Sequence, residues 1–162
     1  MVRIEKGFKT AFALAFVAYI AITITFSLIA SFISGTFQII DLGTYLFGSI
    51  LITPPQALFI IVNNSMNLVN AYIIAELIMT IGFLLACISA AVIAGYFCGG
   101  GKKQAFSSWY LIAVISSIII YVINIIIKNE PVIPQIVNIL STGLLNGIFY
   151  GAIAMLVNPE YF

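Results

Sequence analysis

One stretch of the chain, Ala71–Phe97, is apolar except for a few small polar side chains and a single carboxylate, Glu76. An α-helix rises about 1.5 Å per residue, so about 20 apolar residues cross the hydrocarbon core of a bilayer. Ala71–Phe97 exceeds that length, and a tilted transmembrane helix accommodates the excess. This stretch therefore predicts a chain that folds in a lipid bilayer, where helices satisfy their own backbone polar groups.

The composition of the whole chain agrees with a membrane location. Of the 162 residues, 63% are hydrophobic and 7% are charged, whereas a soluble domain carries roughly 25% charged residues. We expect one polytopic domain over residues 1–162, embedded in the cell membrane. The net charge of +1 gives no basic surface for nucleic acid. Because histidine is absent, we expect no metal site and no cofactor, and histidine-dependent catalysis is excluded.

Three more apolar stretches have the length of a membrane span, at residues 8–33, 105–127 and 135–157. Residues 37–70 are broken by Thr53-Pro54-Pro55, and each remaining piece is short for a full crossing. We predict an all-α integral membrane bundle of four transmembrane helices plus a proline-broken element, either re-entrant or at the outer face. The alternative is six short transmembrane helices, which would resemble, in size and layout alone, the substrate-binding components of vitamin transporters.

The basic residues predict how the chain crosses the membrane. If residues 37–70 enter and leave on the same side, five of the six basic residues face the cytoplasm: Arg3, Lys6, Lys9, Lys102 and Lys103. Only Lys128 then lies outside, as the positive-inside rule favours. A single crossing by residues 37–70 would move two lysines outside. The region is therefore expected to cross either not at all or twice, with both termini in the cytoplasm.

Two series of small residues predict close helix packing. The first, which we call the central seam, recurs every four residues: Gly82, Ala86, Ala90 and Ala94. The second is the C-terminal glycine series, Gly143, Gly147 and Gly151. Such faces let helix backbones approach closely. We expect the two series to pair with each other within the chain, and a contact with another chain or a second copy is the alternative.

Polar residues in the predicted outer half are candidates for a solute site. They are Glu76, Asp41, Asn67, Asn70 and Thr80, and the asparagines belong to a group within residues 63–70. A carboxylate near the hydrocarbon usually faces a cavity, a partner or the interface. The alternative for Glu76 is a solvated position among the outer headgroups. Asn63-Asn64-Ser65 also fits the glycosylation sequon, which requires an external location.

Two functional hypotheses remain open. The first is a non-catalytic subunit or scaffold of a membrane complex or homo-oligomer, which the small-residue series support. The second is a small solute-binding or transport unit with its site near Asp41, Glu76 and the asparagines of residues 63–70. A third class, an intramembrane enzyme, would have to use Asp41 and Glu76 without histidine, so we expect no enzymatic activity.

Overall fold

The computed structural model describes residues 7–36, 38, 41–129 and 131–159, and every regular element among them is a helix. Four helices are long and apolar enough to cross a membrane. They are α1 (Phe8–Ser34), α4 (Ala71–Phe97), α5 (Lys102–Ile126) and α6 (Val132–Val157). The predicted all-helical class and the four apolar helices are therefore confirmed, and the protein has the architecture of a membrane protein.

The start of each of the last two helices differs from its predicted span. Helix α5 begins at Lys102, directly after Gly101, whose φ of 85° ends the preceding turn. Helix α6 begins at Val132, so Pro134 lies in its first turn, where the missing proline N–H breaks no helical hydrogen bond. A span predicted from the sequence begins at its first apolar residues. A first helical turn that is polar or contains proline is therefore left out of the predicted span.

The proline-broken element consists of α2 (Leu42–Phe47), the 3-10 turn η2 (Gly48–Leu51) and α3 (Pro54–Ser65). Its two arms meet at an angle of 106°. Thr53 fixes the start of α3, because its backbone N–H and its hydroxyl both donate to the side-chain oxygen of Gln56, at 2.9 and 2.7 Å. Helices α2 and α3 have 6 and 12 residues, too few to cross separately. The structure therefore favours four long helices over six short ones.

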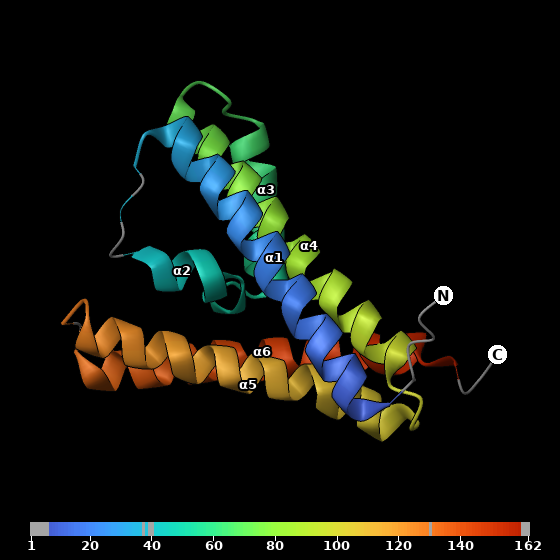
Figure 1. Ribbon diagram of the computed structural model, residues 1–162. Coiled ribbons are helices and arrows are strands. Elements are labelled where there is room, and N and C mark those ends of the chain that lie inside the picture. Colours follow the sequence, from blue (N-terminus) through green and yellow to red (C-terminus); the bar gives the residue numbers. More distant parts are fainter. Residues whose placement is uncertain (1–6, 37, 39–40, 130, 160–162) are drawn as a thin grey trace.

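The long helices form two antiparallel hairpins, α1 with α4 and α5 with α6 (Figure 1). The hairpins meet near the chain ends and the turn after α4, and they diverge toward the opposite end. Helix α2 and η2 lie between the diverging hairpins, and α3 returns to the end of the molecule where α1 ends. Both arms of the element thus turn back toward the end where the hairpins diverge, and for this course within the fold we call it the re-entrant element; its position relative to the membrane stays a prediction.

The placement of the lysines follows from this arrangement. Lys102 and Lys103 begin α5 at the end of the molecule that carries both chain termini, and Lys128 lies beyond the other end of α5 (Figure 1). Arg3 and Lys6 lie outside the described residues. The cytoplasmic location of the termini stays a prediction.

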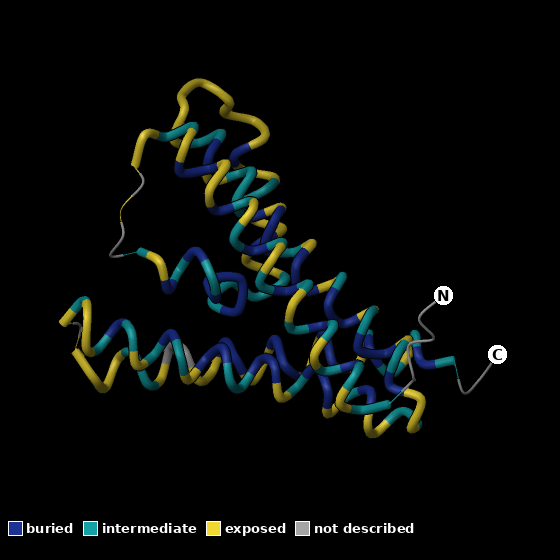
Figure 2. The backbone as a smooth tube through the Cα atoms, viewed as in Figure 1, coloured by how far each residue is buried: buried dark blue, intermediate teal, exposed yellow. Residues whose placement is uncertain are grey.

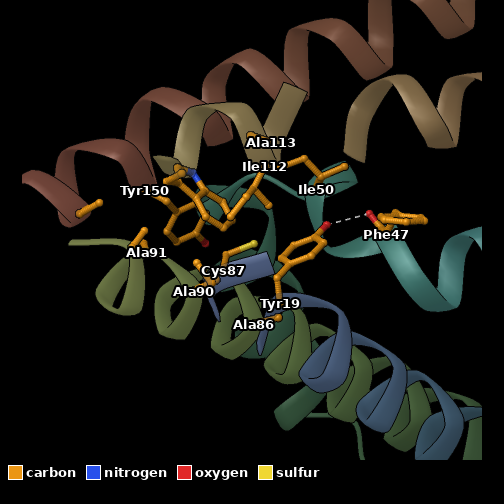
Figure 3. Close-up of a cluster of buried hydrophobic side chains, with 14 of the residues drawn as sticks. Tyr19, Phe47, Ile50, Ala86, Cys87, Ala90, Ala91, Ile112, Ala113 and Tyr150 are labelled. Atoms are coloured by element: carbon orange, nitrogen blue, oxygen red, sulfur yellow. Dashed lines mark hydrogen bonds between the residues drawn. The ribbon is translucent and has the colours of Figure 1, made fainter. Parts of the chain in front are cut away.

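The core lies where the two hairpins meet, and buried residues continue from there along α2 and η2 (Figure 2). Trp109 of α5 is fully buried between Tyr19 of α1 and Tyr150 of α6, with ring centres 5.9 and 5.7 Å away. Both ring pairs are edge-to-face, a geometry that aromatic rings favour. Alanines of the central seam line the same core (Figure 3).

The predicted pairing of the two small-residue series is wrong. The C-terminal glycine series faces α5, where Gly143, Gly147 and Gly151 lie against Ser117, Tyr110 and Phe106. On α4, Gly82 lies against Phe26 of α1, while Ala86, Ala90 and Ala94 are fully buried. A short turn joins α5 to α6, so the neighbouring helix in sequence covers the glycine face. Both series are buried within this single chain.

Candidate functional site

A cavity of about 420 Å³ opens where the hairpins diverge, between the end of α1, the start of α2 and the first turns of α4. We call it the mouth cavity. Three charged side chains from separate parts of the chain line it, namely Asp41, Glu76 and Lys128. The rest of its polar lining consists of hydroxyl-bearing residues at the end of α1, two tyrosines (Tyr45 and Tyr72), Gln38 and Thr44.

Asp41 and Lys128 form an ion pair across the mouth cavity. Asp41 directly precedes α2, and Lys128 follows the last turn of α5. The lysine Nζ donates to a carboxylate oxygen of Asp41 at 2.8 Å, and the side chains of Lys128 and Asp41 are 23% and 35% exposed. Partial shielding from water strengthens such a pair relative to a fully solvated one. The pair therefore joins the re-entrant element to the tip of the α5–α6 hairpin.

Glu76 reaches the mouth cavity from the second turn of α4, and its side chain remains accessible to solvent. Its carboxylate accepts a hydrogen bond of 2.9 Å from the side-chain amide of Asn64, a residue of α3 that is 6% exposed. This bond joins α3 to α4. Because an amide is neutral, it leaves the negative charge of Glu76 without a counter-charge, and no ion pair to Glu76 occurs among the described residues.

The other predicted site residues have local structural contacts. Thr80 is buried and donates to the backbone oxygen of Glu76 at 2.7 Å. Asn70 caps α4 by accepting from the backbone N–H of Ile73, and Asn67 donates to the backbone oxygen of Asn63. None of these three lines the mouth cavity. Of the predicted solute-binding residues, the structure brings together Asp41 and Glu76.

Sequence reasoning missed Lys128 and Asn64 as site residues. The sequence places Lys128 on the predicted outer side together with Asp41, and opposite charges on one side of a membrane are a signal that the two can pair. Asn64 belongs to the asparagine group, but its helical position relative to Glu76 depends on the turn between α3 and α4. The contact between Asn64 and Glu76 therefore depends on how the chain folds, and the spacing of the two residues in the sequence does not predict it.

Side chains from the hairpins hold the re-entrant element in place. Asn146 of α6 donates to the backbone oxygens of Ile50 and Ile52, at 2.8 and 3.0 Å. Tyr19 of α1 donates to the backbone oxygen of Phe47 at 3.1 Å (Figure 3). Buried carbonyl groups outside a regular helix need such partners. These contacts fix the end of α2 and η2 in the core.

The mouth cavity combines charges with hydroxyl groups, an arrangement suited to binding a polar molecule. No group of three histidine, cysteine or acidic residues that could hold a metal ion occurs within the described parts of the chain. Comparisons of this chain with protein-family models, with curated proteins and with solved structures found no match.

Proposed function

We propose that this protein is a non-catalytic solute-binding unit of the cell membrane, which takes a small polar solute into the mouth cavity for uptake or sensing. One observation carries the proposal: Asp41, Glu76 and Lys128 lie far apart in the sequence and line one space of about 420 Å³. Charged side chains are costly near a bilayer and usually serve a pathway or a site.

The size and lining of the mouth cavity support a small-molecule site. Ligand pockets in proteins are concave spaces of roughly 300–1,000 Å³ with a few placed polar groups on an apolar wall. Here the charged and hydroxyl groups stand beside an apolar wall of Ala30, Ala75 and Met79. A solute with both polar and apolar parts would match this lining.

The position of the mouth cavity also supports the proposal. It opens at the end of the molecule opposite the chain termini, which the positive-inside rule assigns to the outside. Behind it, η2 interrupts the helices and lies in the core between the hairpins. Irregular backbone at membrane depth is tolerated where protein covers it, and transporters place their binding sites beside such breaks. Solute would therefore enter from outside.

The alternative function, a subunit or scaffold that joins other chains or a second copy, has less support. That hypothesis relied on the two small-residue series as contact surfaces. Their residues are covered by α1, α5 and the core of the same chain. Because these faces are buried within one chain, they give the assembly hypothesis less support than the mouth cavity gives the solute site.

A ligand screen by thermal unfolding tests the proposal. The protein in lipid nanodiscs is heated with a panel of small anionic, neutral and cationic solutes, and a ligand that binds the folded state raises the unfolding temperature. We expect at least one solute to do so in the wild type, and the shift to fall in D41N and E76Q. Variant N67S is the matched control, because Asn67 is exposed and lies outside the cavity.

Two results would contradict the proposal. One is a screen in which no solute shifts the wild-type protein. The other is a solute-dependent shift that D41N and E76Q retain in full, because the solute would then bind elsewhere. Unfolding temperatures without solute, measured for every variant, separate loss of binding from loss of folding.

A further inference from the structure

We infer that the solute bound in the mouth cavity is a small organic cation whose ammonium group is held by Glu76. This inference deepens the proposed function and rests on it. The charges, the aromatic lining and the apolar wall of the cavity each point to the same class of solute.

The charge balance of the mouth cavity leaves one negative charge. Asp41 is neutralised by Lys128 through their 2.8 Å ion pair. Among the described residues, the neutral amide of Asn64 is the side-chain partner of Glu76, and the other described basic residues, Lys9, Lys102 and Lys103, belong to the opposite end of the molecule. Glu76 is exposed to solvent, and an opposite charge within a few ångströms stabilises the charged form of such a carboxylate. A solute carrying one positive charge would complete this balance.

Two tyrosines supply the aromatic surface that ammonium groups favour. Tyr72 lies four residues before Glu76 on α4, which places both on one face of the helix, and both line the cavity. Tyr45 of α2 lines the cavity from the side of the re-entrant element. Cations within about 6 Å of an aromatic ring centre are attracted to its face. Tyr72 is 64% exposed and Tyr45 6%, so Glu76 and the ring of Tyr72 are the groups that a substituted ammonium ion would meet.

The same lining argues for an organic cation over a metal ion. Calcium takes six to eight oxygen ligands and magnesium an octahedral set. Glu76 is the one carboxylate at the cavity that is free of an ion pair among the described residues. Ala30, Ala75 and Met79 give the cavity an apolar wall, which suits the carbon skeleton of an amine and would leave a metal ion uncoordinated.

The test compares probes of matched shape and different charge. Choline and its neutral isostere 3,3-dimethylbutan-1-ol form one pair, and ethanolamine and ethylene glycol form another. Glycolate serves as the anion. Binding to the protein in nanodiscs of uncharged lipid is measured by isothermal titration and by the thermal shift. We expect at least one cation to bind, its neutral partner to bind at least about tenfold more weakly, and affinity to fall as salt rises.

Glu76 is then tested directly. In E76Q the side chain can still accept from Asn64, so the α3–α4 contact is kept while the charge is removed. We expect E76Q to weaken cation binding about tenfold, within the range of charge-assisted hydrogen bonds. S107K raises the net charge by the same one unit as E76Q, at an exposed position of α5 near the opposite end of the molecule, and should bind as the wild type does. Equal loss in both variants would overturn the inference, because it would indicate a nonspecific surface effect.

The outcomes separate this inference from the proposed function. If glycolate or a neutral probe binds, and binding is lost in K128Q or D41N while both cations fail, the cavity is a solute site of another class. The inference is then wrong and the proposed function stands. If the wider solute screen also yields no ligand of any charge, the proposed function fails with it.

Discussion

Lys128 and Asp41 lie 87 positions apart in the sequence, yet the lysine Nζ stands 2.8 Å from a carboxylate oxygen of Asp41. The pair joins the tip of the α5–α6 hairpin to the start of α2. It therefore fixes the start of α2 against the α5–α6 hairpin, and both of its side chains line the mouth cavity. A solute entering the cavity meets this pair and Glu76 together.

The first prediction concerns the strength of this pair. D41N, K128Q and the double variant form a thermodynamic cycle, measured by unfolding in mixed detergent micelles. Because both side chains are only partly exposed, we expect a coupling of about 0.5–1 kcal/mol, at the upper end for accessible ion pairs. If the effects of D41N and K128Q on the free energy of unfolding are strictly additive, the ion pair contributes nothing to stability.

The second prediction concerns the support of the re-entrant element. N146A removes both hydrogen bonds to the buried carbonyl group of Ile50 and the partly buried carbonyl group of Ile52, and leaves these acceptors without that partner. We expect the free energy of unfolding to fall by about 2–4 kcal/mol, since each unsatisfied buried group costs about 1–3 kcal/mol. The exposed Asn67 provides the control, and N67A should change the same quantity by less than about 0.5 kcal/mol. Equal effects would mean that Asn146 does not hold η2.

The third prediction concerns the contact between α4 and α6. A Cβ atom on Gly95 would overlap the backbone oxygen of Ala154, and backbone atoms cannot move aside cheaply. We expect G95A to destabilise the protein by about 1–3 kcal/mol, although alanine favours helices by about 1 kcal/mol over glycine. G7A is the matched control, because nothing lies within 4 Å of a Cβ at Gly7. A more stable G95A would show that the hairpins do not meet this closely.

The fourth prediction concerns the course of residues 37–70 relative to the membrane. Single cysteines are introduced as T36C, N67C and K103C, all at exposed positions. Cys87 and Cys98 are at most 1% exposed and should react little. In intact cells, a membrane-impermeant maleimide should label T36C and N67C, and label K103C only after permeabilisation. Labelling of K103C but not N67C from outside would indicate a single crossing and contradict the re-entrant course.

Much of the fold followed from the sequence because apolar length is a local property. The four long helices and the break at Thr53-Pro54-Pro55 were predictable, since a span and a proline pair determine the structure of their own neighbourhood. Which helices pack together is not local. The two small-residue series have equivalent spacing, and only the folded arrangement shows that Gly147 faces Tyr110 of α5 and Gly82 faces Phe26 of α1.

The site was predictable in part for the same reason. Asp41 and Glu76 stood out because charges are rare in this chain, and both line the mouth cavity. Asn70 and Thr80 are site candidates by polarity alone, but short polar side chains at helix ends and interiors often bond to nearby backbone, as these two do. The role of Lys128 depended on the direction in which α5 leaves the core, which no pattern in the sequence gives.

The most direct test of the central claim is intact-complex mass spectrometry of the protein purified in mild detergent after incubation with a small-molecule extract of its own cells. The wild type is compared with the D41N/E76Q double variant. The account predicts that the wild-type chain retains a small molecule that is neither lipid nor detergent, and that the double variant loses it. Identical small-molecule content in the two proteins, or no retained molecule in the wild type, would contradict it.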